Sequence, residues 1–199
     1  MVLRDEVWHD DLDIRWALRR EAGEIARLFL ISSDGLAAYI WSQMDMPGLS
    51  LEEIGAVRYA REDTAFSYEK CLVAERSSRI VGMVHSFPME ADPVARPEDD
   101  PVLRPYAELE DVGSLYVSGL AVYPDHRNAG IGTELMECVH ERARAKGLPR
   151  VSLICFERNE PAMRFYDRLG YGEKDRRPIV PHPTLHYADG DAILLVREV

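Results

Sequence analysis

The residues best suited to chemistry gather in one glycine-containing segment past the middle of the chain. This segment runs from Pro124 to Gly132, and a helical pattern follows it. The start of a helix offers unpaired backbone N–H groups and a partial positive charge, which suit a phosphate or pyrophosphate. Gly130 and Gly132 lack Cβ atoms where an anion would approach the backbone, and Arg127 can add a charge-assisted hydrogen bond. The sequence therefore predicts an anion-binding turn.

Two common phosphate-binding motifs do not match this turn. A P-loop needs a Gly-Lys-Ser/Thr sequence, but Gly132 is followed by Thr133 and Glu134, without a lysine. A Rossmann fingerprint needs a small residue three positions after Gly132, where Leu135 stands, and it normally occupies the first strand–helix turn of a chain. What remains is the pattern Arg-x-x-Gly-x-Gly, in which Gly130 also fits the simpler role of capping or bending a turn.

Two strands and two helices must position this turn. The first strand is predicted at Ser114–Val122 and the first helix at Thr133–Lys146, which carries one apolar stripe. Val151–Cys155 is a short, fully apolar strand of the buried kind. The next helix opens at Asn159-Glu160-Pro161 and ends at Gly170. The order of these elements is strand, helix, strand, helix.

The first half of the chain predicts a strand, two helices and a strand hairpin. The expected elements are a strand at Ile14–Arg19, helices around Ile25–Phe29 and at Leu51–Arg61, and strands at Cys71–Glu75 and Ile80–Phe87. Ser50 and Glu53 have the spacing of a capping box. Between Met89 and Asp111 the composition shifts to proline and acidic residues, which predicts a long surface excursion. Two final strands are expected, one starting at Tyr171 and one at Ala192–Val196.

Two motifs together resemble those of the GNAT N-acetyltransferase superfamily. The first is Leu120-Ala121-Val122-x-Pro124-x-x-Arg127-x-x-Gly130-Ile131-Gly132, and the second is Asn159-x-x-Ala162-x-x-Phe165-Tyr166-x-x-x-Gly170-Tyr171. The resemblance covers the chain from about Ile14 to the end, with only the element order matching in the first half. It implies a single α/β (α+β) domain over residues 1–199, with a mixed, mostly antiparallel sheet and helices on both faces. The strands that start at Ser114 and Val151 would diverge to admit the cofactor.

The resemblance also implies acetyl-CoA as cosubstrate and a role for each matched residue. Main-chain groups at Leu120 and Val122 would pair with the pantetheine arm, and Asn159 would hydrogen-bond to it. Tyr166 would lie near the thioester sulfur as the general acid. Amides would hold the pyrophosphate in the segment of Arg127, Asn128, Ala129, Gly130, Gly132 and Thr133. The implied reaction is direct attack of a primary amine, on a small molecule or peptide, at the thioester.

Several of these residues also fit simpler roles. Asn159 before Glu160-Pro161 is a good helix N-cap, and Tyr166 lies on an apolar helix face where a core tyrosine is common. His182 and His186 fit either an acceptor pocket or the surface. The runner-up function is a non-catalytic acyl-CoA-binding module, and a structural protein without a cofactor is disfavoured by the two glycines.

No general base is assigned from the sequence. Some family members carry a catalytic glutamate six residues before the final valine of the cofactor strand, but Tyr116 stands there. Ser118 would share that face of a regular strand. Glu110 and Asp111 near the start of the strand are candidates that would act through water.

Composition narrows the possible partners. The net charge of −11 argues against nucleic acid or an anionic membrane, and it weakly favours a cationic acceptor. The three cysteines have no metal-ligand spacing, so no metal is expected and each is read as a small hydrophobe. Acidic residues near Met1 replace the apolar core of a signal peptide, which predicts a cytoplasmic protein. A homodimer is compatible with the sequence.

Overall fold

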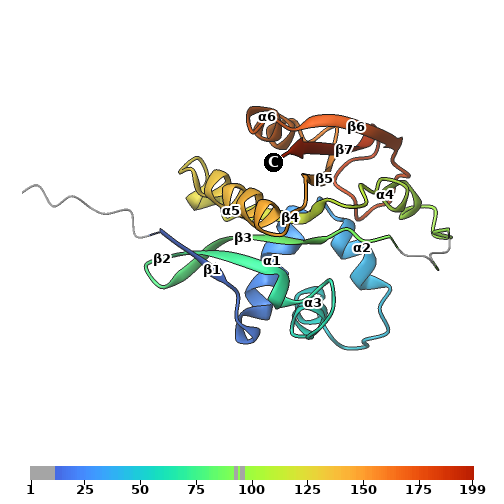
Figure 1. Ribbon diagram of the computed structural model, residues 1–199. Coiled ribbons are helices and arrows are strands. Elements are labelled where there is room, and N and C mark those ends of the chain that lie inside the picture. The colour runs from blue at the N-terminus through green and yellow to red at the C-terminus, as the bar shows by residue number, and fades with distance from the viewer. Residues whose placement is uncertain (1–11, 92–93, 95–96) are drawn as a thin grey trace, which may run out of the picture.

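The computed structural model describes residues 12–91, 94 and 97–199, so the expectation for the segment near Met1 lies outside the described residues. Seven strands form one sheet in the order β1-β2-β3-β4-β5-β7-β6 (Figure 1). The strands are β1 (Leu12–Trp16), β2 (Cys71–Arg76), β3 (Arg79–Pro88), β4 (Leu115–Val122), β5 (Arg150–Phe156), β6 (Gly172–Pro178) and β7 (Asp191–Glu198). β4 and β5 run parallel, and the other neighbouring pairs in the described chain are antiparallel. The predicted mixed, mostly antiparallel sheet of a single domain is confirmed.

The helices are α1 (Ala22–Ser32), α2 (Leu36–Ser42), α3 (Leu51–Tyr59), α4 (Arg104–Ala107), α5 (Ile131–Ala145) and α6 (Glu160–Arg168). Side-chain caps mark the start of two of the helices in the described chain, α3 and α6. At α3 the Ser50 side chain accepts from the Glu53 amide and Glu53 reaches back to the Ser50 amide, so the predicted capping box is present. No helix in the described ranges is long and apolar enough to cross a membrane.

Helices cover both faces of the sheet, as expected. Along β2, Cys71 and Val73 belong to the apolar cluster formed with α1, α2 and α3, whereas Leu72 and Ala74 belong to the cluster formed with α5. Successive residues of a strand point to opposite faces, so the two clusters lie on opposite sides of the sheet. Figure 1 shows this arrangement, with α5 on one side of β3 and α1 and α3 on the other.

The structure corrects the first half in two places. The first strand ends at Trp16 and not at Arg19, because the Leu18 amide donates to the Glu21 carboxylate at 2.8 Å and turns the chain. Helix α2 was not predicted from the sequence. The acidic excursion contains the short helix α4, and it is anchored to α2 where the Tyr39 hydroxyl donates to Asp100 at 2.8 Å.

Candidate active site

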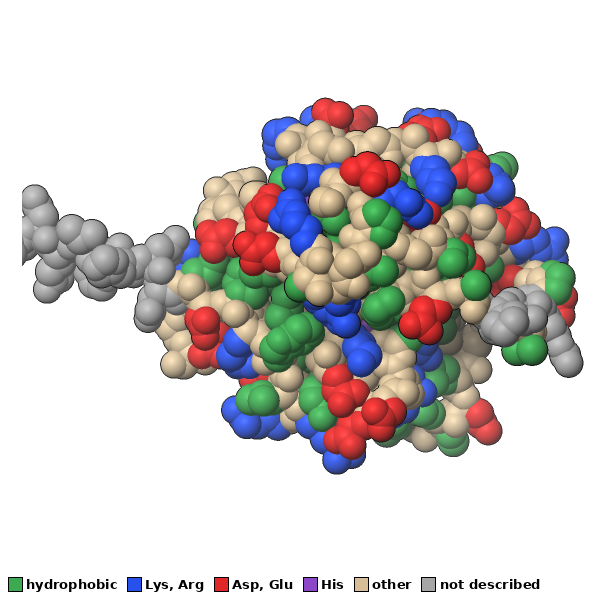
Figure 2. Space-filling view, in the orientation of Figure 1, with side chains coloured by type: hydrophobic (Ala, Val, Ile, Leu, Met, Phe, Trp, Pro, Cys, Tyr) green, Lys and Arg blue, Asp and Glu red, His purple; other side chains and the backbone are tan. Residues whose placement is uncertain are grey.

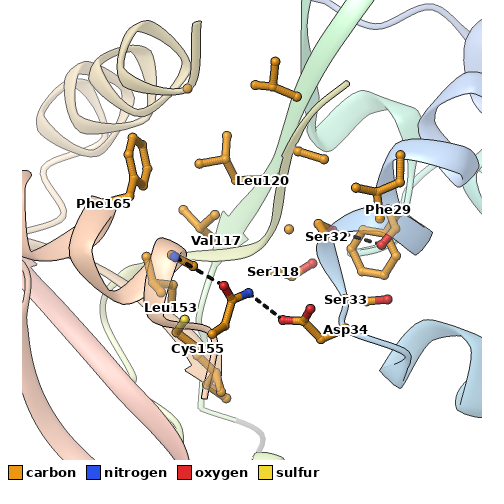
Figure 3. A pocket seen from close by; sticks show the side chains of 18 of the residues that line it. Phe29, Ser32, Ser33, Asp34, Val117, Ser118, Leu120, Leu153, Cys155 and Phe165 are labelled. Atoms are coloured by element: carbon orange, nitrogen blue, oxygen red, sulfur yellow. Dashed lines mark hydrogen bonds between the residues drawn. The ribbon is translucent and has the colours of Figure 1, made fainter. Parts of the chain in front are cut away.

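A cavity opens where β4 and β5 separate. The two strands pair only over Leu115–Val117 against Val151–Leu153, and beyond these residues they diverge as expected from the sequence. The resulting cavity has a volume of about 850 Å³. Its wall includes β4, β5, the connection between α1 and α2, the start of α5, and α6. Figure 3 shows Asp34 on one side of the cavity and Cys155 of β5 on the other.

The edge of β4 that faces the gap carries main-chain groups that have no strand partner in the described chain. The Tyr123 amide donates to the Val81 carbonyl at 2.9 Å, which places that amide on the β3 side. Because successive amides of a strand point in opposite directions, the Leu120 and Val122 amides point away from β3 and into the gap. The Nε atom of Arg127 donates a hydrogen bond to the Val122 carbonyl at 3.0 Å. An extended ligand can therefore lie along β4 and form strand-like hydrogen bonds.

The glycines of the turn have different physical roles. Gly130 is the N-cap of α5 with φ of 81°, a left-handed conformation that favours glycine, and a Cβ there would meet no atom within 4 Å. A Cβ on Gly132 would lie 3.4 Å from the Phe165 ring, which is an ordinary van der Waals contact, so packing against α6 does not require glycine here. Asn128 also has a positive φ, of 61°.

Some backbone amides of this turn already donate a hydrogen bond to another backbone group, and others do not. The Arg127 amide donates to the Pro124 carbonyl and the Thr133 amide to the Gly130 carbonyl. In the described chain, the amides of Asn128, Ala129, Gly130 and Gly132 have no backbone partner. These four amides can therefore donate to a ligand.

Comparison with known families identifies the fold and the type of chemistry. The model of the acetyltransferase (GNAT) family matches residues 35–171, which is more than half of the chain. The chain belongs to this family. A mutant of agmatine N-acetyltransferase in its apo form has a TM-score of 0.67 and 22% identity over 96% of this chain and 100% of that one. A putative acetyltransferase from Salmonella typhimurium with its cofactor acetyl-CoA has a TM-score of 0.60 and 17% identity over 94% of each chain. Acetyl-CoA is the typical cosubstrate of GNAT acetyltransferases.

In this GNAT protein Tyr166 is both a core residue and a cavity residue. Its side chain packs in the cluster with α5, and its ring centroid lies 5.7 Å from that of Tyr171. It also lines the cavity, and within the described residues its hydroxyl has no hydrogen-bond partner. Burial raises the pKa of Tyr166, and Cys155 adds to the shift. The phenol therefore stays protonated and can act as a proton donor but not as a base.

Asn159 caps α6 and also ties it to the opposite wall. Its side-chain oxygen accepts from the Ala162 amide at 3.2 Å, which confirms the N-cap, and its nitrogen donates to the Asp34 carboxylate at 2.8 Å (Figure 3). Sequence reasoning missed Asp34, although the Asp34-Gly35 pair is a turn signal. The two residues have φ of 47° and 92°.

Ser118 lines the cavity and is held by a buried histidine that the sequence did not reveal. The Nε2 atom of His85 lies 2.9 Å from the Ala65 carbonyl, so it carries the proton, and Nδ1 accepts from the Ser118 hydroxyl at 2.7 Å. Burial lowers the pKa of His85 to about 4, which keeps the ring neutral. Because the Ser118 hydroxyl donates its hydrogen to His85, the Ser118 oxygen can only accept hydrogen bonds from a ligand in the cavity.

The other candidate residues lie outside the cavity wall. His182 packs against Tyr39 with ring centroids 4.5 Å apart, and His186 faces Asp34 at 3.4 Å. Asp111 is buried beneath Arg150 and Lys174, so it stabilises the fold rather than acting on an acceptor. Glu110 does not line the cavity either, whereas Tyr116 does.

Proposed function

We propose that this protein is an N-acetyltransferase that moves an acetyl group from acetyl-CoA to a primary amine of a small molecule or peptide. The observation that carries the proposal is the separation of β4 and β5. It leaves the Leu120 and Val122 amides free along a cavity of about 850 Å³, with the α5 N-terminus beside them.

The chain supplies a group for each part of acetyl-CoA. The pantetheine arm lies along Leu120 and Val122, and Asn159 binds it through the second hydrogen of its side-chain amide. The free amides of the turn and the Arg127 guanidinium bind the pyrophosphate. This arrangement uses the backbone for recognition, which explains why Gly130 must provide a left-handed conformation at the start of α5.

Transfer then requires an aligned amine and a proton for the leaving thiolate. The nitrogen attacks the thioester carbonyl directly, and the Val122 amide can stabilise the oxygen as it gains negative charge. Ser118 accepts a hydrogen bond from the amine and orients it. The Tyr166 phenol donates its proton to the leaving thiolate as the C–S bond breaks, and the phenolate regains a proton through solvent as the nitrogen loses one to form the amide. Alignment alone contributes several kcal/mol to such reactions.

Binding of acetyl-CoA is the first test. At a concentration of about 100 times Kd it should stabilise the fold by about 2.7 kcal/mol, which is several degrees in Tm. Gly130→Glu should abolish the shift, because it places a negative charge in the anion site. Gly130→Ala is the matched control, since it carries the same backbone strain without the charge. An unchanged wild-type Tm would contradict the proposal.

Turnover is measured as thiol release with a panel of amines. The panel includes amino acids, polyamines, aminoglycosides and peptides, together with agmatine, the substrate in the name of one structural neighbour. Release that depends on one class of amine supports N-acetyl transfer. A thermal shift without release for any amine would indicate a non-catalytic acyl-CoA-binding module.

A further inference from the structure

A half-buried arginine that has no anionic partner in the described chain lines the cavity. Arg58 belongs to the last turn of α3, and its guanidinium carbon lies 4.4 Å from the centroid of the Phe66 ring. Its Nε atom is buried without a hydrogen-bond partner, and within the described chain its guanidinium forms no salt bridge. Burial lowers the pKa of Arg58, and the nearby Arg61 adds to the lowering. Among the residues that the structure describes, no carboxylate offsets that burial.

Burial of the Arg58 Nε atom without an acceptor is costly in the protein without ligand. A buried charge normally has a partner, because removing it from water is unfavourable unless other polar groups replace the water. The face of Phe66 compensates only in part, since an aromatic ring attracts a cation but does not accept several N–H hydrogen bonds. Both Arg58 and Phe66 line the cavity, so a ligand there can supply the missing acceptor.

A second unpaired donor lines the same cavity. The Tyr106 hydroxyl, from α4, is buried and has no hydrogen-bond partner in the described chain. Burial raises the pKa of Tyr106, and the Asp34 carboxylate adds to the shift, so the hydroxyl stays protonated. Two unsatisfied donors in one cavity, on α3 and α4, indicate a ligand that is rich in acceptor atoms.

The geometry separates Arg58 from the predicted phosphate site at the start of α5, because the two lie on opposite sides of the sheet. Helix α3 packs in the cluster with α1 and α2, whereas the α5 N-terminus belongs to the other face. The anion site beside α5 already has free amides and Arg127. Arg58 is therefore available to the acceptor.

We propose that Arg58 binds a carboxylate of the acceptor, so that the amine acetylated by this protein is of the amino-acid class. This inference rests on the proposed acetyl transfer and narrows its substrate. A planar guanidinium matches a carboxylate with two parallel hydrogen bonds, which gives both orientation and selectivity. The acceptor is then a zwitterion, whose ammonium group loses its proton to solvent before the neutral amine attacks.

The test uses acceptors that differ only in the carboxylate. Glycine, β-alanine, leucine, phenylalanine and glutamate are each compared with the corresponding primary amide, and phosphoserine is included to detect a preference for phosphate. The wild type should give a kcat/KM at least about tenfold higher for the best carboxylate acceptor than for its amide. In Arg58→Met that ratio should fall to about one, mainly through a higher KM for the carboxylate acceptor, and Arg58→Lys should be intermediate.

Two further measurements separate recognition from a structural role. The Tm of Arg58→Met should equal or exceed that of the wild type, because the change removes an unpaired buried donor. A purely structural arginine would instead lower Tm and affect both acceptors equally. Arg27→Met is the matched control, because Arg27 is exposed, paired with Glu24 and Glu52, and absent from the cavity wall.

The outcomes distinguish this inference from the proposed function. If acetyl-CoA binds and other amines are acetylated while carboxylate acceptors are not, or if phosphoserine is preferred, the inference is wrong and the proposed function stands. If no amine is acetylated, calorimetric titration of the same amino acids into the complex with CoA decides. Binding that is lost in Arg58→Met supports the carboxylate site, and absence of binding overturns it.

Discussion

At the residue scale, the question is whether Tyr166 acts in catalysis or only in packing. Its position allows both, because the ring belongs to the apolar cluster and the residue also lines the cavity. The leaving thiol has a pKa of roughly 8.5, so the thiolate is only moderately basic and can depart without full protonation. Proton donation by Tyr166 should therefore contribute near the lower limit of general acid catalysis, about 100-fold.

Tyr166→Phe separates the two roles. The change keeps the ring and removes the hydroxyl, so kcat should fall about 100-fold while Tm and the Kd for acetyl-CoA change little. Tyr171→Phe is the matched control, because its hydroxyl contacts His140 at 2.9 Å and does not line the cavity. It should lower Tm and leave kcat nearly unchanged.

The pH dependence gives an independent check on Tyr166. Burial raises its pKa, so this phenol should remain a donor up to the top of the working range, and no fall in kcat near pH 10 should be traceable to it. A Tyr166→Phe variant with normal kcat and a lower Tm would show that Tyr166 is a core residue only.

At the element scale, one hydrogen bond joins two elements that are distant in sequence. The Asn159 side chain links the N-cap of α6 to Asp34 between α1 and α2, and these residues are 125 positions apart. This bond crosses the cavity, so it holds the start of α6 against the connection between α1 and α2. The cap and the crossing bond use different atoms of one side chain, and substitutions can therefore separate them.

Asn159→Ser keeps a side chain that caps a helix and removes the donor to Asp34, whereas Asn159→Ala removes both. The free energy of unfolding in urea should decrease from wild type to serine to alanine, and the last step should be about 1 kcal/mol, the usual value of an N-cap. A double-mutant cycle between Asn159→Ser and Asp34→Ala should give a coupling of about 1 kcal/mol or more. Strictly additive effects would show that the crossing bond contributes nothing.

The Asn159–Asp34 contact also separates the features that the sequence can predict from those that it cannot. Local signals were sufficient for the strand–turn–helix around Gly130 and for the caps at Ser50 and Asn159, because these depend on neighbours in the chain. Helix α2 was not predicted, since its placement depends on burial of Trp41 against distant residues. Asp34, His85 and Arg58 carry no motif, and only the fold brings them to the cavity or beside it.

At the scale of the whole molecule, the net charge and the cavity act on an acceptor in different ways. The charge of −11 attracts the ammonium group of an approaching amine, yet Figure 2 shows acidic and basic side chains interspersed on the visible face. In the acidic excursion, the Asp100 carboxylate already accepts hydrogen bonds from the Tyr39 hydroxyl and from the Val102 amide. The Glu98 carboxylate accepts from the Asp100 amide at 3.0 Å, and Asp99 is exposed; both carry charge that acts at long range, although neither lines the cavity.

Ionic strength should separate the two effects. Screening acts over about 30 Å at 0.01 M salt and about 8 Å at 0.15 M, so it weakens surface attraction much more than a partly buried contact at Arg58. For an amino-acid amide, which is a net cation, kcat/KM should fall several-fold between these salt concentrations. For the corresponding zwitterionic amino acid it should change less, so selectivity for the carboxylate should rise with salt.

The double variant Glu98→Gln/Asp99→Asn should reduce the salt dependence for the amide, whereas Asp13→Asn/Asp45→Asn, at exposed sites outside the cavity wall, should reduce it less. Equal salt dependence for both acceptors would mean that the surface charge serves solubility and does not guide the amine.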